Sequence, residues 1–295
     1  MKRAPTRCLA RIEMVSADPE ALAEFYLAAF GFLGCGSGPS SVMGGGIELR
    51  LGRQMIKLIR AGPGGRFYPA DVAGWSPLFQ HIAIVVADMA RAYAHLCTIP
   101  AWQPISTSGP QLLPAASGGV SAFKFRDPEG HPLELIAFPP NAVPEPWRAS
   151  AQGIYLGIDH SAISVSNTAI SVDFYESLGL GRSGGSFNVG REQALLDGVS
   201  DPMVEVTSLT PAQTTPHVEL LCYRGDFDRR VRAQDPDDVI ASRLVLAVEN
   251  RAILEALCTD HSAALLSGPA SRAKDLHCAL MRDPDGHLIW LEASA

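Results

Sequence analysis

The sequence predicts an α+β protein made of four copies of one unit, each with a strand, a helix and further short strands. Three pairs of similar segments lead to this fold class. The first pair is a DP-x-GH turn followed by an apolar strand, FRDPEGHPLELIAFP at 125–139 and MRDPDGHLIWLEA at 281–293. The other two pairs are 80–97 with 242–258, and 10–32 with 159–180.

The order of elements is the same in the two members of each pair. The segment 10–32 begins with an apolar strand and continues as a helix that contains Phe-Tyr. Asp18 followed by Pro19 is a favourable N-cap and first helical position. Gly31, and Gly179 in the second copy, stand where a helix C-cap is expected. This order predicts four units, at 8–60, 78–138, 156–223 and 240–292.

Connecting segments rich in glycine, proline and charge separate the four units. The middle connection, 139–155, contains four prolines and is therefore the best candidate for a boundary. Units one and three resemble each other, and so do units two and four. This pattern predicts a duplicated two-unit protein with one half at 1–147 and the other at 148–295.

Composition and charge narrow the class of function. The net charge is −7 and no basic run stands out, which argues against a nucleic-acid partner. No apolar run reaches about 18 residues, and the basic N-terminus is not followed by an apolar segment, so we expect no membrane partner and no secretion signal. The six cysteines are scattered without a C-x-x-C pair, which is typical of reduced thiols in a cytoplasmic protein.

The four-unit layout resembles the vicinal oxygen chelate superfamily, which includes glyoxalase I, bleomycin-resistance proteins and extradiol dioxygenases. The resemblance covers nearly the whole chain. Its most specific elements are DHSAISV, HIAIVV and the two DP-x-GH-x-x-[E/W] segments. It implies four βαβββ modules that form two cup-shaped mixed β-sheets with flanking helices. It also implies metal ligands on the first and last strands of the modules.

The expected ligand positions differ between the modules. Aligned on their apolar alternation, the four first strands give Arg11, His81, His160 and Arg243. The four last strands give Lys57, Glu134, Glu219 and Trp290. Modules two and three therefore each carry a His and a Glu, whereas modules one and four carry neither.

Two pairings of the modules are open, and they have different consequences. If module one pairs with two and three with four, as in extradiol dioxygenases, each cup has two ligands beside cations that repel a metal. If the middle modules pair, His81, Glu134, His160 and Glu219 face one centre. The outer cup would then be metal-free and cationic, through Arg11, Lys57 and Arg243.

Two imidazoles and two carboxylates suit a divalent transition metal with open positions, and Zn, Ni, Mn, Fe and Co all remain candidates. The order His, Glu, His, Glu looks like that of bacterial glyoxalase I. The same residues also persist in metal-free relatives, so a structural role is the alternative. His131 and His287 follow the repeated turns and are interpreted as turn-capping or surface residues. Whether His217, near the rim of the cup, belongs to a pocket is left open.

The resemblance implies that the ion chelates two neighbouring oxygens of a small-molecule substrate and acts as a Lewis acid. The leading hypothesis is a glyoxalase-like lyase or isomerase that works through a metal-bound enediolate or oxyanion, with Glu134 or Glu219 moving the proton. One alternative is an extradiol-type ring-cleavage dioxygenase, although Arg243 and Trp290 replace two members of its triad in the dioxygenase pairing. Another is a metal-free small-molecule binding protein of the bleomycin-resistance type, favoured by Trp290 and the cationic column. Both a monomer and a homodimer are compatible with four modules.

Overall fold

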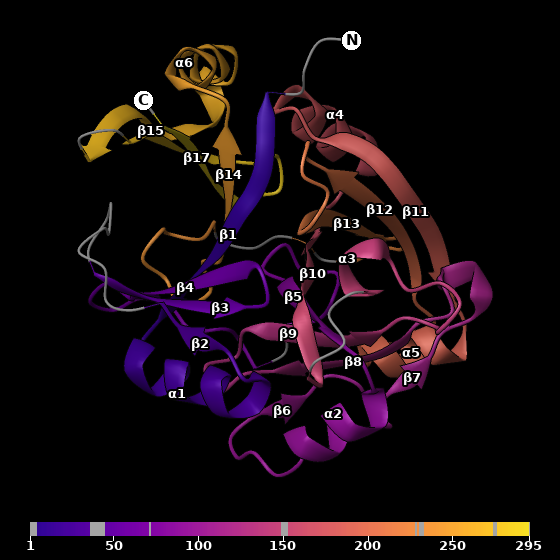
Figure 1. Cartoon of the computed structure of the whole chain (residues 1–295). Helices are drawn as coiled ribbons and strands as arrows, with labels where there is room; N and C mark the ends of the chain where they lie inside the picture. Colours follow the sequence, from indigo (N-terminus) through magenta and orange to yellow (C-terminus); the bar gives the residue numbers. More distant parts are fainter. Residues whose placement is uncertain are drawn as a thin grey trace.

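The computed structural model of the chain describes residues 5–35, 45–70, 72–148, 153–227, 229, 233–273 and 276–294. Two mixed β-sheets of eight and nine strands form its body, and α-helices lie around them (Figure 1). The α+β fold class with two large sheets is therefore confirmed. None of the described helices is long and apolar enough to cross a membrane.

Each of the four units begins with a strand, continues with a helix and ends with further strands. Module one consists of β1 (Thr6–Ser16), α1 (Pro19–Phe30), β2 (Leu33–Gly34), β3 (Gly46–Leu51) and β4 (Gln54–Arg60). Module two consists of β5 (Gln80–Val86), α2 (Met89–Leu96), β6 (Gln103–Pro104), β7 (Gln111–Leu112), a 3₁₀ turn (Ala115–Ser117), β8 (Ser121–Arg126) and β9 (Pro132–Ala137).

The second half repeats this order after a short helix in the middle connection, α3 (Glu145–Arg148). Module three consists of β10 (Tyr155–Ser164), α4 (Thr168–Ser177), β11 (Gly181–Val189), α5 (Arg191–Asp197), β12 (Met203–Thr210) and β13 (His217–Tyr223). Module four consists of β14 (Arg243–Val248), α6 (Arg251–Asp260), a 3₁₀ turn (Ser262–Ala264), β15 (Leu265–Ala273), β16 (Leu276–Arg282) and β17 (Leu288–Ser294).

The pairing of the modules is the feature on which the site depends. The nine-stranded sheet has the order β11-β12-β13-β10-β5-β9-β8-β6, with β7 also paired to β8, and joins modules two and three. The eight-stranded sheet has the order β15-β16-β17-β14-β1-β4-β3-β2 and joins modules four and one. The pairing of the two middle modules, one of the two that the sequence left open, is thus the one observed. Each sheet takes one module from each half of the chain, and the division into domains at 147 stays a prediction.

Strand register confirms the alignment of the ligand positions. In the nine-stranded sheet, Glu134 pairs with the residue two after His81, and Glu219 pairs with the residue two after His160. In the eight-stranded sheet, Trp290 stands in the same relation to Arg243. The same holds for Lys57 and Arg11. The two sheets therefore offer four equivalent positions each. We call the face of the nine-stranded sheet that carries these positions the middle cup, and that of the eight-stranded sheet the outer cup.

Alternation along each strand separates the core from the cups. In β5, Ile82 and Ile84 belong to the main apolar core, which takes residues from both sheets and from the helices. His81 and Ala83 point to the other face, because successive strand residues alternate. The helix ends support this packing as the sequence predicted. The side chain of Asp18 caps the N-terminus of α1, and Gly31 ends that helix in the left-handed conformation at φ 67°.

The first DP-x-GH turn connects the two sheets. Its His131 is buried rather than on the surface, which corrects one of the two interpretations open from the sequence. The imidazole donates to Asp127 Oδ2 at 2.9 Å and to the backbone carbonyl of Val15, in β1 of the other sheet, at 2.9 Å. Asp127 also accepts a hydrogen bond of 3.1 Å from the hydroxyl of Tyr26 in α1. We call Tyr26, Asp127 and His131 the first clasp.

The second turn connects the sheets in the opposite direction through similar contacts, except that Nδ1 of His287 has no hydrogen-bond partner among the described residues. His287 is fully buried and lies 2.8 Å from the carbonyl of Ser164 in β10. Asp283 accepts a hydrogen bond of 3.1 Å from the hydroxyl of Tyr175 in α4. Tyr175, Asp283 and His287 form the second clasp. The turn sequence is repeated because each copy ties the last hairpin of one sheet to the first strand and helix of the other.

Candidate metal centre in the middle cup

The four predicted ligands come from four neighbouring strands and line one cavity. His81 lies on β5, Glu134 on β9, His160 on β10 and Glu219 on β13. The cavity that they line has a volume of about 180 Å³. The structure therefore brings all four residues together, as the pairing of the middle modules requires.

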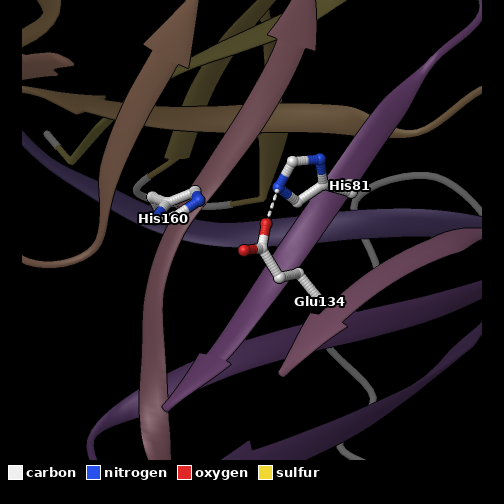
Figure 2. A group of neighbouring side chains, drawn as sticks. All are labelled: His81, Glu134 and His160. Carbon is white, nitrogen blue, oxygen red and sulfur yellow. Dashed lines mark ion pairs between the residues drawn. The ribbon is translucent and has the colours of Figure 1, made fainter. Parts of the chain in front are cut away.

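Their donor atoms lie close to one another. His81 Nε2 is 2.8 Å from Glu134 Oε2, and His160 Nε2 is 3.5 Å from Glu219 Oε2. Figure 2 shows His81 and Glu134 facing each other, with His160 on the adjacent strand. The donor atoms of these three residues all lie within 4.8 Å of one another. Ligands that share one ion at about 2.0–2.2 Å lie about 3–3.5 Å apart, so the observed spacings are compatible with a shared cation.

The imidazole of His81 supplies a direct test of whether the site suits a metal. Its side chain is buried, yet among the described residues neither ring nitrogen has a hydrogen-bond partner. The contact of Nε2 with Glu134 Oε2, at 2.8 Å, is an ion pair when the ring is protonated. Burial lowers the pKa of His81, which keeps the ring in the neutral form that a metal binds. A buried nitrogen without a partner is costly, and a bound ion would satisfy it.

Asp159 is a member of the site that the sequence analysis did not identify. Its Oδ2 accepts a hydrogen bond of 3.0 Å from Nδ1 of His160, which leaves Nε2 facing the cavity. The indole N–H of Trp147, in α3, donates to the other carboxylate oxygen at 3.0 Å. A carboxylate that orients a histidine in this way is common behind metal ligands. The register shift between Ile158 and His160 explains how adjacent residues reach one side.

Glu219 is held from behind by two other groups. The hydroxyl of Ser208 donates to its Oε1 at 3.0 Å, and Nε2 of His217 lies 3.5 Å from the same oxygen. Burial would raise the pKa of Glu219, but the imidazoles of His160 and His217 hold it well below its ordinary value. His217 also lies 3.8 Å from Asp159. It therefore belongs to this group of residues, a question that the sequence left open.

A buried lysine completes the wall of the cavity. Lys124, opposite Glu134 in the β8–β9 pairing, forms an ion pair of 2.7 Å with Asp197. Burial lowers the pKa of Lys124, but Asp197 and Glu134 outweigh this effect and raise it, so the amine stays charged. Asp197 is fixed further by hydrogen bonds from Gln193 at 2.7 Å and Tyr223 at 2.9 Å. These contacts bring α5 of module three against a strand of module two, and no repeat in the sequence indicates them.

The charges around the cavity favour a cation. Burial lowers the pKa of His160, but Glu219, Asp159 and Glu134 outweigh it and raise the pKa to about 9. The three carboxylates thus stabilise the protonated, positively charged form of the His160 ring. A divalent ion would take the place of that proton, since oxygen and imidazole donors suit the first-row transition metals. The residues present therefore fit a divalent metal.

Comparison with known proteins agrees with this fold. No family model and no curated protein matches the sequence. Glyoxalase I from Zea mays superposes with a TM-score of 0.66 at 16% identity, covering 98% of this chain and 92% of that one. A putative dioxygenase from Bacillus subtilis superposes with a TM-score of 0.58 at 12% identity, covering 99% and 86%. The chain therefore shares the fold of glyoxalase I and of the putative dioxygenase. The resemblance read from the sequence is confirmed, and at these identities the likeness shows the fold alone.

The outer cup is built differently at the equivalent positions. Trp290, in place of Glu134, is buried in an apolar cluster with Val245 and Leu280. The described part of the chain contains two clusters of three potential metal ligands, and both lie in the middle cup.

The predicted cationic column of the outer cup is largely neutralised. Arg11 forms an ion pair of 2.7 Å with Glu13 and a second with Glu292 at 2.5 Å. Arg243 lies 3.5 Å from the other carboxylate oxygen of Glu13. Glu13 also pairs in register with Lys57. The expectation of a cationic cup was incomplete because it considered only the ligand positions and omitted these two carboxylates.

Proposed function

We propose that the chain is a metal-dependent enzyme of glyoxalase-like lyase or isomerase type, acting on a small molecule with two neighbouring oxygen atoms. The observation that carries this proposal is the convergence of His81, Glu134, His160 and Glu219 on one cavity in which Nδ1 of the buried His81 ring has no hydrogen-bond partner among the described residues. These four residues would hold the ion. Bound there, a divalent ion would supply Lewis acidity to the two substrate oxygens.

The two glutamates have different surroundings, and we assign them different roles. Glu134 lies between His81 and the positive charge of Lys124, and these neighbours lower its pKa against the effect of burial. The pKa of Glu219 is lowered as well, so ionisation does not distinguish the two glutamates. We assign Glu134 as the permanent ligand because it belongs to the compact group with His81 and His160. Glu219 lies farther from the compact group of three, and Ser208 and His217 offer it contacts outside that group. It can loosen and carry the proton between neighbouring carbon atoms.

His217 fits a role in moving this proton to and from the solvent. Its side chain is partly exposed, whereas His160 and Glu134 are buried. It touches both Glu219 and Asp159, so it can exchange a proton with the carboxylate that carries one. Lys124 and Asp197 keep the opposite wall rigid and charged, because each is satisfied by the other.

Two matched substitutions test the assignment. Glu134→Gln should lower the metal content of the purified protein, whereas Glu219→Gln should retain most of the metal and lose proton transfer. The readouts are elemental analysis and the rate at which solvent deuterium enters hydroxyacetone, followed by nuclear magnetic resonance. Both oxygens of this small ketone can bind one ion, and its exchange needs no knowledge of the natural substrate.

Full exchange activity in both variants would refute the role of the glutamates. Failure of the wild-type protein to bind any of the five candidate metals after reconstitution would refute the enzyme itself and favour the metal-free binding protein. Exposed Glu176 provides the control, since Glu176→Gln removes a similar charge from α4 and should change neither readout.

A second candidate is an extradiol-type dioxygenase, and one observation favours it. The compact group His81, Glu134 and His160 consists of two histidines and one carboxylate, the ligand type of non-haem Fe(II) oxygenases. The test is anaerobic reconstitution with Fe(II), followed by addition of a catechol and oxygen. Appearance of a yellow ring-cleavage product would favour this reaction over the isomerase.

A further inference from the structure

A second cavity lies beside the candidate metal centre. It has a volume of about 470 Å³, against about 180 Å³ for the first. Its walls come from the ends of β5 and β10 and from the connection between the two halves of the chain. The lining residues are mostly apolar and include Val85, Val86, Phe138, Val143, Trp147 and Leu156.

The two cavities share parts of their walls. Phe138 lines both of them. Trp147 lines the second cavity, and its indole N–H donates to Asp159, which lines the first and holds His160. The apolar cluster that contains Ala83, Val85 and Ile136 continues from one to the other along the same face of the sheet. The second cavity is therefore continuous with the wall of the site and not a separate surface feature.

The size of the first cavity limits what it can hold. A volume of about 180 Å³ corresponds to on the order of six water-sized groups, enough for a pair of oxygens and the carbons that carry them. Carboxylates, imidazoles and an ammonium group surround that space. Apolar residues such as Leu113, Val204 and Leu221 also line it, but its small volume leaves no room for a long apolar substituent beside the oxygen pair, whereas the second cavity offers further space with aliphatic and aromatic walls.

We propose that the substrate carries an apolar arm next to its oxygen pair, and that this arm lies over Phe138 in the second cavity. The inference rests on the proposed function, since it requires the oxygen pair to be bound by the ion in the middle cup. The arm is of the size of a phenylalkyl or medium alkyl group. The middle connection of the chain, through Val143 and Trp147, thereby determines which substrates are accepted.

A homologous series of hydroxamates tests the proposal on the metal-loaded protein. Each compound presents the same two neighbouring oxygens, and only the arm grows, from acetohydroxamate to hexanohydroxamate and octanohydroxamate. Burial of one methylene group strengthens binding about fourfold, so affinity measured by calorimetry should rise by about that factor per carbon until the cavity is filled.

Substitutions at Val143 locate the arm. Val143→Glu places a charge in the second cavity, and Val143→Trp fills it, so both should remove the gain with arm length and leave acetohydroxamate binding unchanged. The two variants change the site in opposite ways, and either one that folds is sufficient. Glu145→Gln is the control, because this exposed residue of the same segment does not line the cavity.

The possible failures are distinguishable. If acetohydroxamate does not bind the metal-loaded protein, the proposed function fails, and this inference fails with it. If acetohydroxamate binds but longer arms give no gain, the inference is overturned while the proposed function stands. A gain that persists in the folded Val143 variants would place the arm elsewhere and also overturn the inference.

Discussion

The middle and outer cups have the same strand register but differ in how their buried charges are compensated. In the middle cup, histidines and carboxylates converge on a cavity, and Nδ1 of His81 lacks a hydrogen-bond partner among the described residues. In the outer cup, Arg11 and Arg243 share the carboxylate of Glu13, and Trp290 fills apolar space. Equivalent backbone positions therefore do not make equivalent sites. In the outer cup, the charges are balanced by other side chains. In the middle cup, we propose that a bound cation balances the carboxylates.

Substitution of Glu13 should have the largest effect, because it breaks the charge balance of the outer cup. Glu13→Gln removes the carboxylate shared by the half-buried guanidinium group of Arg11 and the buried one of Arg243. Loss of one partner from a buried ion pair costs about 3–5 kcal/mol, and urea unfolding should report a loss of this order. Glu20→Gln breaks the exposed pair with Arg60 and should change stability by less than about 0.5 kcal/mol. Similar losses in both variants would contradict the description of the outer cup as a buried network.

Substitution of His81 should abolish the stabilisation of the middle cup by metal. His81→Leu also removes the ion pair of 2.8 Å with the buried carboxylate of Glu134, so the metal-free protein should lose some stability as well. An ion at 100 times its dissociation constant stabilises the wild-type fold by about 2.7 kcal/mol, and this gain should disappear in the variant. Thermal unfolding with and without metal measures both quantities. An equal response of both proteins to metal would place the ion outside this site.

The second clasp is expected to contribute less than either cup. Tyr175→Phe removes the hydrogen bond to the buried carboxylate of Asp283, and hydrogen bonds to charged groups are worth about 1.5–3 kcal/mol. Chemical unfolding should show a loss of about 2 kcal/mol with no change in metal content. Tyr26→Phe, at the equivalent position of the first clasp, should cost a similar amount. A loss of metal in either variant would mean that the clasps and the site are coupled.

The smallest predicted effect is a pH dependence at the first clasp. Burial lowers the pKa of His131, but Asp127 outweighs this and raises it above its ordinary value of 6.5. A raised pKa adds stability that is complete below the unfolded value and is lost as the pH rises through the folded value. The difference in unfolding free energy between the wild type and His131→Gln should therefore narrow on the alkaline side. A difference that is constant between pH 6 and 10 would contradict the charged form of His131.

Sequence alone predicted the fold and the four residues that meet in the middle cup because both depend on repeated local patterns. Alternation and the duplicated segments located the strands, and the positions of His81 and Glu219 within them followed. The pairing of the middle modules was one of two open arrangements. The argument that favoured it was physical, since the other pairing places ligands beside permanent cations.

The parts that the sequence did not predict depend on contacts between distant segments. Strict alternation would point Asp159 away from His160, and only a local register shift brings both to one side. Lys124 meets Asp197 across two modules, and its counterpart in the outer cup is Leu280, so no repeat could indicate it. His131 was open to a surface interpretation because turns usually face solvent, but the second sheet covers this one.

The most direct test of the account is a metal titration of the metal-stripped protein, followed by calorimetry, beside the variants His160→Ala in the middle cup and Arg11→Ala in the outer cup. We predict one divalent ion per chain for the wild type and for Arg11→Ala, and an affinity at least about tenfold lower for His160→Ala. Substitution of a residue behind a metal ligand already lowers metal affinity by about tenfold or more, and loss of the ligand itself should lower it further. Unchanged binding in His160→Ala, or its loss only in Arg11→Ala, would contradict the assignment of the metal to the middle cup.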